Sequence, residues 1–158
     1  MRKILFLDRD GVINIEKNYL YKIEDFEFCE GIFEFCRYFL NKDYIIIVVT
    51  NQSGIARGYY NQSDFDTLSN WMIDRFQEEN IKISHIFHCP HHPNFSKCNC
   101  RKPDIGMIEK TKKIYNIDLD NSLLVGDKIS DIECAKNSGI KNAILIDNII
   151  NINKMFGI

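Results

Sequence analysis

Residues 3–11 of the chain read KILFLDRDG, a short apolar run followed by two aspartates one residue apart and a glycine. The run predicts a buried strand, and Gly11 predicts the turn after it. Two carboxylates at such a turn can hold a hard cation such as Mg²⁺. They can also act as a nucleophile and a proton donor, the pair that phosphoryl transfer through an aspartyl phosphate requires. Because a short acidic turn also occurs by chance, the rest of the chain decides its meaning.

Predicted strands and helices alternate along the 158 residues. Apolar runs predict strands at 3–7, 44–49, 83–88, 122–125 and 143–146, and helical spacing predicts helices at 31–41, 62–79, 104–115 and 129–137. This order predicts an α/β fold with a doubly wound parallel sheet, formed as one domain over residues 1–158. Ligands of such sheets bind beyond the carboxyl ends of the strands, so we expect the segments that follow the strands to share one rim.

The composition is that of an ordinary globular protein. Hydrophobic residues make up 45% of the chain and charged residues 27%, and the net charge of −2 gives no basic surface for nucleic acid. The first apolar run is too short for a signal peptide, and residues 44–49 are too few to span a membrane. We therefore expect a cytoplasmic protein without a nucleic-acid or membrane partner, and a monomer by default.

Four soft metal ligands gather within twelve residues after the third predicted strand. Cys89, His91, Cys98 and Cys100 supply three thiolates and an imidazole, enough for a closed tetrahedral zinc site. Since no position is left for water, the zinc is predicted to be structural. The spacing favours His91 over His92 as the fourth ligand but does not decide between them. The alternative to a zinc site is a loop with surface thiols and histidines. The other three cysteines are scattered and are expected to do no chemistry.

Polar groups also follow the remaining predicted strands. Residues 50–54, TNQSG, offer a hydroxyl and exposed backbone N–H groups as a cradle for phosphate oxygens, although they are also common turn formers. Arg101 and Lys102 can neutralise a phosphoryl group in transfer, with a solvated basic pair as the alternative. Asp127 can complete an oxygen-ligand set for Mg²⁺, and Asp131 can support it or simply begin a helix.

These four blocks, in this order, resemble the motifs of the haloacid dehalogenase superfamily of phosphohydrolases. The matching residues are Asp8-x-Asp10-Gly11, Thr50, Lys102 and Gly126-Asp127. The stretches FLDRDGVIN (6–14), IEDFEF (23–28) and TNQSGIARG (50–58), with the Cys-His-Cys-Cys loop, narrow the resemblance to members that dephosphorylate heptose bisphosphates or histidinol phosphate. The similarity runs from Lys3 to about Ile146, nearly the whole chain.

The resemblance implies a capless, magnesium-dependent phosphatase that acts on a small sugar bisphosphate through an aspartyl phosphate. Asp8 would be the nucleophile, and Asp10 the general acid and then the base. Thr50, Arg101 and Lys102 would complete the catalytic set. Thr50 and Lys102 would hold the phosphoryl group, and Arg101 would contact the substrate. Mg²⁺ would bind Asp8, the backbone carbonyl of Asp10 and Asp127, and Zn²⁺ would bind Cys89, His91, Cys98 and Cys100.

The implied substrate contacts come from four segments. They are Glu16, Lys17, Asn18, Tyr19, Asn51, Gln52, Ser53, Arg57 and Lys128. A bisphosphate needs cations at its second phosphate, and Arg57 and Arg101 are available there. Asn18 departs from the family pattern, because a glycine often precedes the tyrosine at this position.

Three other functions remain open at this point. Histidinol phosphate is the second substrate candidate, in place of a heptose bisphosphate from the route to lipopolysaccharide or capsule precursors. A receiver-type domain that stores phosphate on aspartate shares the parallel sheet, but Asp10 argues against it because a proton donor serves turnover. A zinc-dependent interaction module would leave Asp8, Asp10 and Asp127 unexplained.

Overall fold

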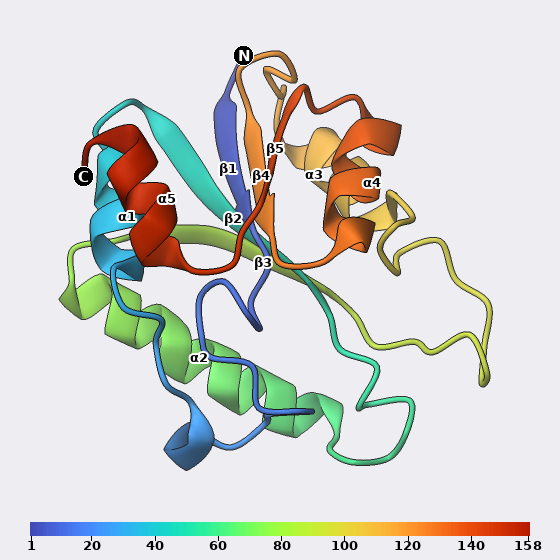
Figure 1. Ribbon diagram of the computed structural model, residues 1–158. Helices are drawn as coiled ribbons and strands as arrows, with labels where there is room; N and C mark the ends of the chain where they lie inside the picture. The colour runs from blue at the N-terminus through green and yellow to red at the C-terminus, as the bar shows by residue number, and fades with distance from the viewer.

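The computed structural model describes residues 1–158 and contains a five-stranded, all-parallel sheet between two layers of helices (Figure 1). In the sheet order β3-β2-β1-β4-β5, the strands are β1 (Lys3–Leu7), β2 (Tyr44–Asn51), β3 (Ile83–Cys89), β4 (Leu123–Gly126) and β5 (Asn142–Leu145). The helices are α1 (Ile32–Leu40), α2 (Gln62–Glu78), α3 (Gly106–Ile114), α4 (Ile129–Ser138) and α5 (Ile149–Phe156), with a 3-10 turn at Ile23–Asp25. The predicted doubly wound parallel sheet is confirmed.

Different helices cover the two faces of the sheet. Leu5 and Leu7 of β1 pack in a core with α1, α2 and α5, while Ile4 and Phe6 pack in a second core with α3 and α4. Figure 1 shows α1 and α5 on one side of the strands and α3 and α4 on the other. These four apolar side chains of β1 are fully buried, and the burial of each one stabilises the fold by about 1.5–3 kcal/mol. None of the helices combines the length and apolarity needed to cross a membrane.

The order of strands reverses beside β1. The chain adds β2 and β3 on one side of β1 and then β4 and β5 on the other. Leu7 of β1 therefore lies opposite Val125 of β4, and the acidic segments after the two strands begin side by side. Open α/β sheets form their ligand crevice at such a switch point. This topology places Asp8 and Asp127 at one rim.

The structure contains one helix that the sequence analysis does not predict. Ile149 and Ile152 of α5 are buried in the core beside α1, and the side chain of Asn148 caps the helix by accepting a hydrogen bond from the backbone of Asn151. Only eight residues long and containing two asparagines, α5 has a weak helical pattern in the sequence. Strand β2 is also longer than predicted, so Thr50 lies in the sheet rather than in the following loop.

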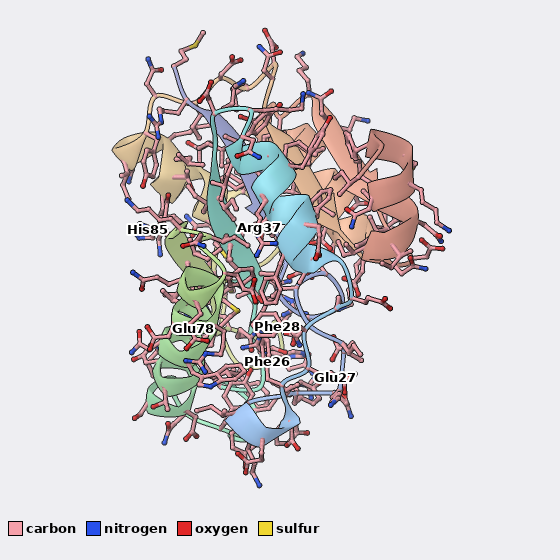
Figure 2. All side chains as sticks on the ribbon, turned by 90° about the vertical axis from the view of Figure 1, so that its left-hand side faces the viewer. Phe26, Glu27, Phe28, Arg37, Glu78 and His85 are labelled. Carbon is pink, nitrogen blue, oxygen red and sulfur yellow. The ribbon has the colours of Figure 1, made fainter.

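Aromatic side chains attach the long connection between β1 and α1 to helix α2. Phe26 and Phe28 of this connection lie close to α2 (Figure 2). The ring centroid of Phe26 lies 5.3 Å from that of Trp71, and the centroid of Phe28 lies 5.4 Å from that of Phe76. Such pairs contribute about 0.5–1.5 kcal/mol beyond their burial. They tie down the connection whose earlier part, residues 16–19, reaches the rim of the sheet.

Candidate active site

A polar pocket of about 630 Å³ opens at the rim of the sheet. It brings together most of the predicted catalytic and substrate-binding residues, namely Asp8, Asp10, Glu16, Asn18, Tyr19, Asn51, Gln52, Ser53, Arg101, Lys102 and Lys128. Tyr60, Pro103, Ser130 and Asp131 complete the lining. Its volume is in the range of small-molecule sites, and its polar lining suits a charged ligand.

Lys102 lies between two buried carboxylates. Its Nζ is 3.0 Å from Oδ1 of Asp8 and 2.6 Å from Oδ1 of Asp131, and it also donates to the backbone oxygen of Val49 at 2.8 Å. Asp131 accepts a second hydrogen bond, at 3.1 Å, from the backbone of Lys128 at the start of α4. Asp131 therefore stands at the helix start, as one of its two possible roles requires, and it also pairs with the lysine.

Burial and the neighbouring charges at this rim shift the pKa values of Asp8 and Lys102. Burial raises the pKa of Asp8 to about 7, with Lys102 opposing this effect and the nearby acids, led by Asp131, adding to it. Burial lowers the pKa of Lys102, but the adjacent carboxylates of Asp8 and Asp131 outweigh it and leave this pKa above its usual value. A cation among these acids would favour the ionised form of Asp8.

The acids at the rim fit an oxygen-ligated cation. Asp8, Asp127 and Asp131 each offer a carboxylate oxygen within 4.8 Å of the others. Oδ1 of Asp127 is buried without a hydrogen-bond partner. A Cβ at Gly11, whose φ is +88°, would lie 2.0 Å from Oδ2 of Asp127, so glycine leaves the space that this carboxylate occupies. A buried, unpartnered carboxylate oxygen beside other acids suits Mg²⁺.

Asp10 is held by different groups from those that hold Asp8. Its Oδ1 accepts from Nη2 of Arg9 at 3.1 Å and from Nδ2 of Asn14 at 3.0 Å, and its Oδ2 accepts from Nε2 of Gln52 at 3.0 Å. The Arg9 side chain is buried and donates as well to the backbone oxygen of Leu20 at 2.9 Å. The two aspartates thus have separate environments, one beside a lysine and one among neutral amides and a guanidinium.

Asn51 fixes the backbone of Lys102. Its Nδ2 donates to the oxygen of Lys102 at 3.2 Å, and its Oδ1 accepts from the N–H of Lys102 at 3.0 Å. Both backbone polar groups of the lysine are therefore paired with one amide side chain. Thr50 is fully buried, and its hydroxyl accepts from Nε2 of Gln52 at 2.9 Å. Much of the polar rim thus serves to orient other rim residues.

The predicted soft ligands form one cluster, in which the ligand atoms lie within 4.8 Å of one another and could hold a metal ion. Nδ1 of His91 is 3.6 Å from the sulfur of Cys89 and 3.3 Å from that of Cys100. The sulfur of Cys89 lies 3.7 Å from that of Cys98, close to the separation of about 3.8 Å that a tetrahedral zinc with bonds of about 2.3 Å gives, but only 2.7 Å from that of Cys100, so these two sulfurs would have to move apart to bind the same zinc. All cysteines are free, and His92 lies outside the cluster.

Two predicted substrate contacts do not line the pocket. Nζ of Lys17 donates to the backbone oxygen of Asp25 at 2.8 Å. Nη2 of Arg57 lies 2.7 Å from Nε2 of His92, and its guanidinium lies 5.7 Å from the centre of the Tyr19 ring. Asn18 has a φ of 44°, in the left-handed region that glycine adopts with the least strain.

Comparison with known proteins places the chain among phosphatases. A family model described as polynucleotide kinase 3 phosphatase matches residues 3–145. The D-glycero-alpha-D-manno-heptose-1,7-bisphosphate 7-phosphatase of Campylobacter jejuni is 54% identical over 92% of this chain and 83% of its own length. The D-glycero-beta-D-manno-heptose-1,7-bisphosphate 7-phosphatase of Haemophilus ducreyi is 40% identical over 92% of this chain and 83% of its own length. A solved D,D-heptose 1,7-bisphosphate phosphatase from B. bronchiseptica has a TM-score of 0.86 at 24% identity, covering 98% of this chain and 97% of that chain.

A buried aspartate paired with a lysine at the switch point of a parallel sheet is the arrangement expected of haloacid dehalogenase phosphatases, and the relatives agree that the protein is a phosphoric monoester hydrolase of this class. Within the class, the chain belongs to the family of D-glycero-D-manno-heptose-1,7-bisphosphate 7-phosphatases.

Proposed function

We propose that this protein removes the 7-phosphate of D-glycero-D-manno-heptose 1,7-bisphosphate, with the α anomer preferred. The observation that carries the proposal is the direct contact of Asp8 with Lys102 in a polar pocket that also contains Asp10. The α anomer is favoured because identity is 54% to the alpha-named relative and 40% to the beta-named one. The product would enter the route to nucleotide-activated heptose for lipopolysaccharide or capsule.

The proposed reaction has two steps, the phosphorylation of Asp8 and the hydrolysis of the aspartyl phosphate. A carboxylate oxygen of Asp8 attacks phosphorus, the bond from phosphorus to the sugar oxygen breaks, and Asp10 gives its proton to that oxygen. Water then attacks the phosphorus of the aspartyl phosphate and gives a proton to Asp10, which frees the Asp8 carboxylate and inorganic phosphate. Lys102 neutralises the charge beside the nucleophile in both steps.

We infer two metals with different tasks. Mg²⁺ would bind the carboxylates of Asp8 and Asp127 and the backbone carbonyl of Asp10. The ion would supply positive charge to the phosphoryl oxygens. The solved B. bronchiseptica enzyme is described as a complex with magnesium and phosphate, which supports this assignment. A structural Zn²⁺ would bind Cys89, His91, Cys98 and Cys100. The last of these ligands, Cys100, stands two residues before Lys102 in the chain.

We further propose a single domain that works as a monomer in the cytoplasm. Residues of one chain line the polar pocket and supply the proposed nucleophile, proton donor and lysine. All six cysteines are free thiols, which suits a reducing compartment.

The substrate assignment is tested by comparing kcat/KM for both anomers of the heptose bisphosphate, histidinol phosphate and a 3′-phosphorylated oligonucleotide. We expect the α anomer to give the highest value. The oligonucleotide tests the activity that the name of the matching family model suggests. A higher kcat/KM for histidinol phosphate or the oligonucleotide would overturn the substrate proposal, and a higher value for the β anomer would overturn only the anomer.

Removal of zinc is expected to lower activity by up to about 100-fold, the scale of losing one charge-stabilising group. The reason is that Cys100 holds the segment carrying Lys102. The zinc content and kcat/KM are measured after chelation, with Mg²⁺ restored in excess and then with Zn²⁺ added back. The Cys98→Ser variant is expected to behave like the zinc-free protein, whereas Cys29→Ser, outside the cluster, is the matched control. Full activity in zinc-free protein would contradict the bracing role.

A further inference from the structure

The two carboxylate oxygens of Asp10 have unequal sets of hydrogen-bond donors. Oδ1 accepts from Nε and Nη2 of Arg9, at 3.3 and 3.1 Å, and from Nδ2 of Asn14 at 3.0 Å. A carboxylate oxygen offers about two lone-pair sites, so three donors saturate Oδ1. Oδ2 accepts from Nε2 of Gln52 alone, at 3.0 Å. Oδ2 is therefore the oxygen with room to carry a proton.

The amide of Gln52 has only one orientation that satisfies its neighbours. Nε2 donates to Oδ2 of Asp10 and to Oγ1 of Thr50, at 3.0 and 2.9 Å. Oε1 accepts from the hydroxyl of Tyr60. Turning the amide over would place its oxygen against the Asp10 carboxylate and its NH₂ group against the Tyr60 hydroxyl. A carboxylate oxygen only accepts, so Asp10 selects this orientation, and the Tyr60 hydroxyl anchors the amide in it by donating to Oε1.

The fold holds Tyr60 firmly in this place. Its ring is buried and stacks on Tyr21 with a centroid distance of 5.4 Å and an interplanar angle of 11°. A Cβ at Gly54 would lie 2.2 Å from the Tyr60 ring, so glycine at 54 makes room for it. Burial raises the pKa of Tyr60 to about 12, against the lowering effect of Arg9, so the hydroxyl keeps its proton at neutral pH and donates.

We propose that Tyr60 is a positioning residue for proton transfer: acting through Gln52, it orients Oδ2 of Asp10, the atom that carries the proton to the leaving sugar oxygen. In this step the O–H bond at Oδ2 breaks as an O–H bond forms on the departing alkoxide, and in the second step Oδ2 takes a proton from the attacking water. The inference rests on the proposed aspartyl-phosphate reaction. It assigns to Gln52 a role other than substrate contact.

Tyr60→Phe tests this directly because it removes the hydroxyl and keeps the stacked ring. The kcat/KM values are compared for the heptose bisphosphate, whose alkoxide must be protonated, and for p-nitrophenyl phosphate, whose leaving group departs as an anion. For Tyr60→Phe we expect a loss of about fivefold with the sugar substrate, the scale of one hydrogen bond, and a change below about twofold with the aryl substrate. Tyr59→Phe, the half-exposed neighbour outside the network, is the matched control with both values unchanged.

A double-mutant cycle with Gln52→Met separates action through Gln52 from a general structural effect. In the Gln52→Met background, Tyr60→Phe is expected to cause no further loss with the sugar substrate. Equal losses on both substrates, additive losses in the cycle, or no loss for Tyr60→Phe would each overturn the proposal. If wild type does not hydrolyse the heptose bisphosphate, the substrate proposal fails by itself, and the same ratio is measured with the alkyl phosphate that wild type hydrolyses best.

Discussion

Replacing Asp10 with asparagine is expected to trap the phosphorylated enzyme. The variant keeps the shape of the side chain but has no carboxylate to take a proton from water, so the aspartyl phosphate on Asp8 persists. Steady-state turnover should fall by about 10²–10⁴-fold, the usual contribution of a general acid and base. Intact-protein mass spectrometry of a quenched reaction with p-nitrophenyl phosphate measures the phosphoenzyme, because this substrate needs no protonated leaving group.

The matched control is Asp120→Asn, which makes the same chemical change at an exposed position before β4. It should show wild-type turnover and no accumulated phosphoenzyme. Normal turnover of Asp10→Asn would refute the role of Asp10. A phosphoenzyme that is equally long-lived in wild type would also contradict this role, because Asp10 would then not speed its hydrolysis.

Replacing Lys102 with methionine is expected to reduce both stability and activity. The change leaves the buried carboxylates of Asp8 and Asp131 without their cation, and breaking a buried ion pair in this way costs about 3–5 kcal/mol. Because Lys102 lowers the pKa of Asp8, its loss raises that pKa further and protonates the nucleophile. We expect kcat/KM to fall by about 10²–10³-fold. Thermal unfolding and steady-state kinetics measure the two effects.

The stability of this variant should also depend on pH. An acid whose pKa is higher in the folded than in the unfolded protein binds more protons when folded, so stability falls as pH rises from the unfolded pKa to the folded one. For metal-free Lys102→Met, this window begins near the ordinary value of 3.8 and extends past about 7, the pKa of Asp8 with the lysine present. The unfolding temperature of the metal-free variant should therefore be higher at pH 5 than at pH 8. This difference should be larger in the variant than in metal-free wild type.

Two further variants make the lysine prediction specific. Lys97→Met removes an exposed lysine from the same connection and should change neither stability nor activity. Adding Asp131→Asn to Lys102→Met removes one of the two orphaned charges and should recover part of the stability but none of the activity. Wild-type stability in Lys102→Met would show that the buried ion pairs do not stabilise the fold.

The sequence predicts the parts of this protein that depend on local patterns. The β-branched run at 44–49 identifies a strand buried on both faces, and alternation with helices identifies a parallel sheet. The rim follows, because parallel strands end at the same edge. The pattern fails for α5, whose asparagines weaken the helical signal while its isoleucines are buried by tertiary packing. It fails also for the end of β2, where pairing of Asn51 with Cys89 extends the strand.

The sequence by itself determined the alternation of strands and helices and the chemistry at the strand ends: two acids, a hydroxyl, a lysine, a third acid and four soft ligands. The tertiary structure alone decided which polar group meets which. It joins Lys102 to Asp8 across 94 positions, places Asn51 on the backbone of Lys102, and brings Tyr60 to Gln52 and so to Asp10. The physical reason is that periodicity is set by near neighbours along the chain, whereas hydrogen-bond partners depend on side-chain directions that only packing fixes.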